Sequence, residues 1–158
     1  MKKGKIVFVS LVLMLVCAAG TFAQERKGYI KPTFGLGFGS ASGGGSSISG
    51  MAMSFDVDFV NSIGVTLGVQ NIFLFSDLGL NLHPFGAGYT YDADNWSVGG
   101  KLMAVPTSLV DGGFGFDVNG SYWFNENIGL TGIIDLYFGT AGNGGTVFSL
   151  RVGVSTKF

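Results

Sequence analysis

Few residues in this chain carry the side chains that enzymes use for catalysis. The only histidine is His83, next to Pro84, and no serine or acidic partner for acid–base chemistry can be identified for it. Asp92 and Asp94 could ligate calcium, but two acids in a tight turn are more often solvated, and no zinc-type spacing exists. We therefore predict no catalytic residue, no metal site and no cofactor.

A second group of charged residues is spaced for ion pairs between neighbouring strands. Lys101 and Asp117 lie eight residues on either side of Leu109, the middle of a predicted loop. Asp135 and Arg151 are placed in the same way about Asn143, the middle of the next long loop. If each loop closes a hairpin, the two members of a pair face each other, which favours opposite charges.

A third pair is expected near the start of the mature chain. Lys31 and Asp58 lie at nearly matched positions about the first long loop, with Asp56 one step diagonal. Unpaired charges inside a narrow barrel would be costly, so pairing would stabilise it. The alternative is chance alignment of a few charges on one face. We predict that these pairs keep the interior mostly closed.

The elements that position these charges follow from a period-two pattern, which is typical of β-strands. Apolar residues alternate with small or polar ones over most of the chain, and the charges within strands fall on the small, polar face. In the fourth strand the apolar residues before and after His83 and Pro84 fall on opposite parities, and a bulge there would bring them onto the same face. Residues 40–50 are predicted to form a flexible glycine–serine loop. The eight predicted strands cover residues 29–39, 51–59, 63–75, 78–91, 96–104, 114–124, 128–138 and 148–158.

Composition decides which face of these strands is outside. Only 12% of the residues are charged, whereas 28 are glycine and 15 are phenylalanine. A secreted soluble sandwich or lipocalin-like barrel would expose the small, polar face, which carries too few charges for solubility. Aromatic residues also gather at the strand ends, as they do at the two interfaces of a membrane. The net charge of −1 without a basic run argues against nucleic-acid binding.

The first 23 residues are typical of a secretory signal peptide. Three lysines lie within the first five residues, an apolar segment covers residues 6–19, and small residues precede a predicted cleavage between Ala23 and Gln24. Lipidation of Cys17 is the alternative, but Val16 is larger than the residue that normally precedes a lipidated cysteine. Residues 24–158 then form one domain that has six basic and ten acidic residues and no cysteine.

The whole mature chain resembles the small eight-stranded outer-membrane β-barrel proteins of Gram-negative-type bacteria, the opacity and outer membrane protein W, X and A group. The last eight residues resemble the assembly signal of that class, with Arg151 as the polar residue, Gly153 two positions later and Phe158 as the terminal aromatic. Thr156 departs from it, because an aromatic residue is usual there.

The resemblance implies an all-β, eight-stranded antiparallel up-and-down transmembrane β-barrel in the bacterial outer membrane. It also implies contact with outer-membrane lipid, the barrel-assembly machinery and periplasmic chaperones, and we expect a monomer. For function we expect a structural or surface role. The alternatives are a narrow passage or pocket for small, hydrophobic molecules, which the resemblance to protein W suggests, and an outer-membrane enzyme, which only His83 supports.

Overall fold

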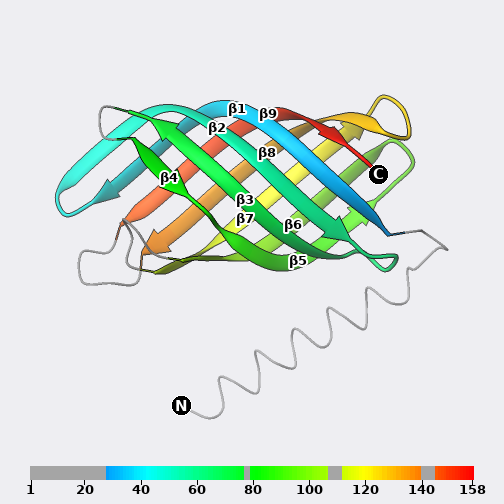
Figure 1. Ribbon diagram of the computed structural model, residues 1–158, viewed down its shortest axis with the longest axis horizontal. Coiled ribbons are helices and arrows are strands. Elements are labelled where there is room, and N and C mark those ends of the chain that lie inside the picture. The colour runs from blue at the N-terminus through cyan, green and yellow to red at the C-terminus, as the bar shows by residue number, and fades with distance from the viewer. Residues whose placement is uncertain (1–27, 77–78, 107–111, 140–144) are drawn as a thin grey trace, which may run out of the picture.

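The computed structural model describes residues 28–76, 79–106, 112–139 and 145–158, and these form an antiparallel β-barrel (Figure 1). The predicted signal peptide and Cys17 lie outside the described residues, as do the loop centres Leu109 and Asn143. The strands are β1 (Tyr29–Gly43), β2 (Ser46–Val60), β3 (Val65–Phe75), β4 (Leu80–Leu82), β5 (Phe85–Asp92), β6 (Trp96–Val105), β7 (Gly113–Trp123), β8 (Ile128–Gly139) and β9 (Thr146–Thr156).

The barrel closes because the first and last strands pair. β1 is hydrogen-bonded to both β2 and β9, and β2 also pairs with β3. The backbone N–H and C=O of Phe158 each bond Ile30 at 3.1 Å, which extends the closing seam to the last residue. β4 and β5 pair with β3 one after the other and together form one barrel strand, so the nine assigned strands make an eight-stranded barrel. The predicted all-β, eight-stranded up-and-down barrel is confirmed.

The predicted bulge at His83 and Pro84 is wrong, because two residues lie between the paired segments on each strand and the register of β4 continues into β5. β3 pairs with β4 up to the pair Ile72–Leu82 and resumes with β5 at the pair Val69–Phe85. Between these pairs, the N–H of Gln70 donates to the carbonyl oxygen of Pro84 at 2.8 Å. Proline has no N–H to give to a ladder, so the strand assignment is interrupted at these two residues without a change of register. Leu80 and Leu82, which were expected outside, therefore point inward.

The predicted glycine–serine loop over residues 40–50 is wrong. The two strands run on to Gly43 and Ser46, and only Gly44 and Gly45 form the turn. Their φ angles are +58° and +81°, the left-handed values that a two-residue hairpin turn requires and that glycine adopts without strain. Small polar residues therefore continue the hairpin rather than ending it.

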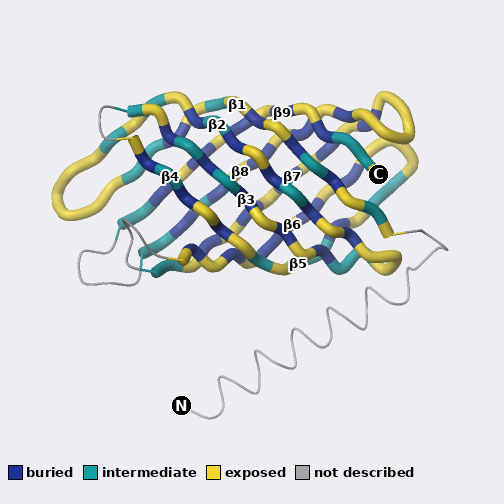
Figure 2. Tube along the Cα trace, viewed as in Figure 1, coloured by how far each residue is buried: buried dark blue, intermediate teal, exposed yellow. Residues whose placement is uncertain are grey.

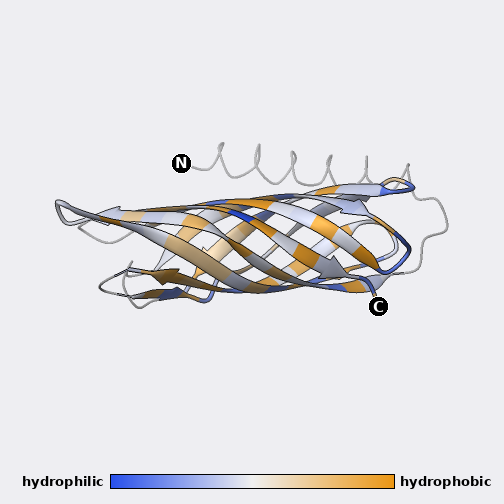
Figure 3. Cartoon of the chain, turned by 90° about the horizontal axis from the view of Figure 1, so that it is seen from above, coloured by the Kyte–Doolittle hydropathy of each residue, from blue (hydrophilic) through white to orange (hydrophobic). Residues whose placement is uncertain are grey.

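Alternate residues point into the barrel and away from it. Buried and exposed positions alternate along the strands (Figure 2), and hydropathy alternates with them (Figure 3). The inside has two zones. Toward the end where β1 begins and the chain finishes at Phe158, called the terminal end here, it is polar. Toward the opposite end, called the loop end, it is lined by an apolar cluster that includes Ile72, Leu74, Leu82, Met103 and Val105.

Inward-facing glycines make room for the larger side chains. A Cβ added to Gly115 would collide with the ring of Tyr137 and with the carbonyl oxygen of Leu136, and would lie 2.9 Å from Tyr137 Cα. Gly115 and Tyr137 are direct cross-strand partners, so the ring lies over the glycine. The outward-facing Gly132, by contrast, has nothing within 4 Å of such a Cβ.

We expect Gly115→Ala to destabilise the barrel by about 1–3 kcal/mol, because the added methyl must displace the Tyr137 ring or the backbone of β8. Gly132→Ala, the matched control on the outward face, should change stability by less than about 0.5 kcal/mol. Urea unfolding of the refolded protein, followed by tryptophan fluorescence, measures both. Equal stability of the two variants would contradict the close packing at Gly115.

Candidate functional site: the buried ionic lumen

Seven charged side chains lie inside the barrel and are almost fully buried. None of them exposes more than 4% of its surface. Strand alternation places them there, because each has the inward parity of its own strand. The seven, which we call the lumen network, are Lys31, Asp56, Asp58, Lys101, Asp117, Asp135 and Arg151.

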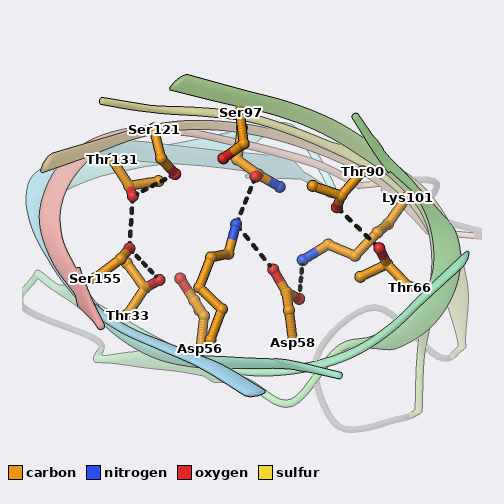
Figure 4. A network of polar contacts seen from close by, with 12 residues as sticks. Thr33, Asp56, Asp58, Thr66, Thr90, Ser97, Lys101, Ser121, Thr131 and Ser155 are labelled. Carbon is orange, nitrogen blue, oxygen red and sulfur yellow. Dashed lines mark hydrogen bonds and ion pairs between the residues drawn. The ribbon is translucent and has the colours of Figure 1, made fainter. Parts of the chain in front are cut away.

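Lys101 joins two strands on different sides of the lumen. It lies directly opposite Asp117 in the β6–β7 ladder, and its Nζ is 3.3 Å from Asp117 Oδ1. The same ammonium group donates to Asp58 Oδ1 of β2 at 2.5 Å (Figure 4). A Cβ at Gly68 would lie 2.6 Å from Asp58 Oδ1 and 2.9 Å from Lys101 Cδ, so only glycine leaves room for this contact.

Asp58 is shared between two lysines. Lys31, its direct partner in the β1–β2 ladder, places Nζ 3.4 Å from Asp58 Oδ2. Lys31 also donates to Asn119 Oδ1 at 2.9 Å, and Asn119 Nδ2 donates to Asp117 Oδ1 at 2.7 Å. These contacts connect Lys31, Asp58, Lys101, Asp117 and Asn119 in one ring of charges and amides.

Arg151 binds two carboxylates. Its Nη1 is 3.2 Å from Asp56 Oδ2, its Nη2 donates to Asp135 Oδ2, and its Nε donates to Ser149 Oγ at 3.1 Å. The predicted register is wrong here by two residues, since Asp135 lies opposite Ser149 and Arg151 lies opposite Ile133. The long guanidinium side chain spans this offset diagonally. Asp56, expected near Lys31, is bound by Arg151 instead.

Asp117 and Asp135 face each other across the β7–β8 ladder, and a neutral side chain separates their charges. Gln70 Nε2 donates to Asp117 Oδ2 at 2.5 Å and lies 3.4 Å from Asp135 Oδ1. The Tyr137 hydroxyl lies 2.5 Å from Gln70 Oε1 and 3.1 Å from Asp135 Oδ1. Hydrogen-bond donors thus compensate four carboxylates that meet only three cations inside the described part of the barrel.

Sequence reasoning did not single out Gln70, Asn119 or Tyr137. All three have the inward parity of their strands, and they are longer than the serines, threonines and glycines around them. Their size on the inward face is the sequence feature that could have identified them as members of the network. A long neutral polar side chain that is buried on a lumen face needs a hydrogen-bond partner inside the barrel.

Beyond the charges toward the terminal end, hydroxyl groups join neighbouring strands. Thr33 and Ser155 are 2.6 Å apart, Ser155 and Thr131 are 2.5 Å apart, and Thr131 and Ser121 are 2.7 Å apart (Figure 4). This chain of hydroxyls fastens the β1–β9 seam to β7 and β8.

Lys157 closes the barrel at the terminal end. Its Nζ is 3.1 Å from Asp92 Oδ1 and 4.0 Å from the centre of the Trp123 ring, a cation–π contact. The Tyr29 hydroxyl donates to Asp92 Oδ2 at 2.7 Å. Residues from β1, β5, β7 and the chain end are therefore in contact with one another at the terminal end of the barrel.

The apolar zone at the loop end contains a small pocket with a cavity volume of about 10 Å³. Its walls come from β1, β2, β3, β4 and β9 and are almost entirely apolar, with Ser149 at the boundary to the lumen network. The lining residues are Gly39, Ala52, Ile72, Leu74, Leu80, Leu82, Val147, Phe148 and Ser149.

Within the described ranges, no group of three or more histidines, cysteines or acids is arranged to hold a metal ion. His83 is exposed between β4 and β5, where the unbroken alternation turns it outward, away from the buried carboxylates. No helix among the described residues is long and apolar enough to cross a membrane.

Solved structures with the same fold are small β-barrels. Neisserial surface protein A is 17% identical, with a TM-score of 0.62, covering 83% of this chain and 97% of its own. Ail of Yersinia pestis, solved with a heparin analogue, is 10% identical, with a TM-score of 0.57, covering 84% and 100%. The N-terminal barrel domain of Pseudomonas aeruginosa OprF is 14% identical, with a TM-score of 0.55, covering 85% and 100%.

These three structures are eight-stranded barrels of bacterial outer-membrane proteins. No protein-family model and no curated protein matches the sequence. At such low identity the likeness shows the fold that the chains share.

We expect Arg151→Met to lower the free energy of unfolding by about 3–5 kcal/mol, because it leaves Asp56 and Asp135 buried without their cation. The matched control is the triple variant Asp56→Asn, Asp135→Asn and Arg151→Met, which keeps the side-chain sizes and removes the charges together. It should lose much less stability. Urea unfolding in lipid vesicles measures both, and a triple variant as unstable as the single one would contradict charge pairing as the stabilising interaction.

Proposed function

We propose that this chain, which has the fold of the small eight-stranded outer-membrane β-barrels, is an integral outer-membrane protein whose ion-paired lumen is closed to free passage. The observation that carries the proposal is the inversion of the usual soluble pattern. Phe34 and Leu150 expose nearly half of their surface, whereas Arg151 exposes none. An apolar outside around a charged inside is stable when the surrounding solvent is lipid.

The route to the membrane is part of the proposal. Cleavage between Ala23 and Gln24 would release the barrel domain after export, and periplasmic chaperones would keep it unfolded until assembly. Arg151, Gly153 and Phe158 would then present β9 to the barrel-assembly machinery. In the folded barrel Phe158 exposes 79% of its surface at the terminal end, so it also suits the aromatic belt at a membrane interface.

The role that the lumen supports best is structural or at the cell surface, without catalysis. Salt bridges join β1 to β2, β2 to β6, β6 to β7, and β9 to both β2 and β8, so the charged layer crosses the lumen rather than lining it. An eight-stranded barrel has an interior that side chains can fill. A conducting pore would need a continuous wet path that this layer interrupts.

We expect the refolded protein to show no sustained discrete openings in a planar lipid bilayer. Lys101→Ala removes the ammonium group that bridges Asp58 and Asp117 and should produce measurable openings. Ser47→Ala, on the exposed hairpin at the loop end, is the control that should stay silent. Sustained openings of the unmodified protein would contradict a closed lumen and favour the passage function.

A second function is favoured by the apolar pocket at the loop end. The apolar walls suit an alkyl segment rather than a polar solute, but the cavity of about 10 Å³ holds only a methyl-sized group, so a longer segment requires the lining side chains to move. The lumen network closes the floor of the pocket, so a molecule held there would not pass through the barrel. We therefore propose binding of small hydrophobic molecules as the alternative to a purely structural role.

Photolabelling with a diazirine-bearing fatty acid tests this pocket. In vesicles, we expect adducts on the inward residues Leu74 and Leu80 of the unmodified protein. Ala52→Phe fills the pocket and should abolish these adducts, while adducts on the outward Phe75 persist because bulk lipid reaches them. If no inward adduct forms on the unmodified protein, the pocket does not bind alkyl chains.

A further inference from the structure

One stretch of the outer wall differs from the rest of the outward face. Between the aromatic strand ends, the outward positions of the described strands carry apolar side chains or glycine, with three exceptions: Asn71 on β3, Asn81 on β4, and Thr156 at the last position of β9. The exposed His83 lies two residues after Asn81, on the same outward face. Asn81 is placed by the direct pairing of its neighbours Leu80 and Leu82 with β3. We call Asn71, Asn81 and His83 the β3–β4 polar patch.

The patch lies within the apolar band rather than at its edge. Asn71 is paired with Phe55, which is itself paired with the outward Phe34. Asn81 is paired with Phe73, two residues before the aromatic end of β3 at Phe75. If the barrel is inserted as proposed above, these amides face hydrocarbon, where polar side chains are costly and serve a purpose when they occur.

The wall behind the patch is apolar. The inward partners in this part of the ladder are Ile72 with Leu82 and Leu74 with Leu80, all four buried. They belong to the apolar cluster of the loop end. The register of the ladder is the same from the pair Leu74–Leu80 to the pair Val65–Tyr89, so a register slip does not explain the outward amides.

The amide oxygens of the patch lack hydrogen-bond partners within the described part of the chain. Asn71 Oδ1 and Asn81 Oδ1 are both shielded from solvent and have no hydrogen bond. Both side chains are half-buried, and rotation about χ2 exchanges the amide oxygen with the amide nitrogen. Each amide can therefore present either a donor or an acceptor to a molecule that docks against this wall.

A second copy of this barrel satisfies these groups. An amide is complementary to another amide, so two identical patches related by a twofold axis can pair donor with acceptor in both directions. Ala87 and Ala104, both exposed on the neighbouring strands β5 and β6, are small enough to let two walls approach. Small side chains beside interfacial amides are the combination that joins membrane-spanning elements.

We propose that the β3–β4 polar patch is the contact surface between two copies of this barrel, paired side by side in the bilayer. The proposal rests on membrane insertion and replaces the expectation of a monomer. The hydrogen bonds missing within one copy form between Asn71 and Asn81 of the two copies, and His83 lies beside them.

Cysteine cross-linking in vesicles tests the contact, because residues 24–158 contain no cysteine. Phe85→Cys places a thiol beside the patch on the exposed face while keeping all three polar residues. Ile134→Cys places one on the exposed face of β8, across the barrel in the strand order, as the matched control. We expect oxidation to cross-link the first variant into dimers at least about tenfold faster than the second at equal protein-to-lipid ratio.

Removing the amides separates specific pairing from random collision. Adding Asn71→Leu and Asn81→Leu to the Phe85→Cys variant should slow cross-linking by about tenfold. Equal rates for Phe85→Cys and Ile134→Cys, or an unchanged rate without the amides, would overturn the proposal. Protection from protease added outside the vesicles reports insertion separately, so failure to insert contradicts the proposed function, whereas insertion without patch-specific cross-linking contradicts only the dimer.

The design does not depend on one variant folding. Each protein is checked by the gel mobility shift that a folded barrel shows before heating. If Phe85→Cys does not fold, Ala87→Cys, exposed on the same strand, takes its place with the same expected contrast.

Discussion

The buried charges of the lumen are the constraint on which the rest of the barrel depends. Three cations and four carboxylates lie inside a wall whose outer face is apolar. A charge that is removed from water without a partner costs several kcal/mol, and a side chain inside a narrow barrel has little room to turn toward solvent. Each charge must therefore reach an opposite charge or a hydrogen-bond donor, and the strands must hold the register that allows it.

That requirement explains which residues surround the charges. Gly68 leaves the space in which Lys101 crosses to Asp58, and Gly115 leaves the space for the ring of Tyr137. Gln70 stands between the two facing carboxylates of β7 and β8. Much of the glycine content therefore belongs to the packing of the lumen, since small residues on some strands accommodate long side chains from others.

The sequence could predict what depends on alternation within a strand and on pairing within a simple hairpin. It placed Lys101 opposite Asp117 and Lys31 opposite Asp58, because both hairpins are nearly symmetric about their turns. It misplaced Arg151 by two residues, because the middle of a loop in the sequence need not be the centre of the hairpin that the loop closes. It could not show that Lys101 reaches Asp58, because contacts across the lumen arise only when the barrel closes. The Gly44–Gly45 turn was missed because small polar residues suit strands outside the membrane as well as loops.

The central claim is that charges on different sides of the lumen stabilise one another, and a double-mutant cycle on Lys101 and Asp58 tests it most directly. The free energy of unfolding in lipid vesicles is measured for the unmodified protein, Lys101→Met, Asp58→Asn and the double variant. Residues in direct contact show a coupling of about 0.5–3 kcal/mol, and we predict a value of at least about 1 kcal/mol for this pair. Additive effects, with a coupling below about 0.3 kcal/mol, would contradict the account.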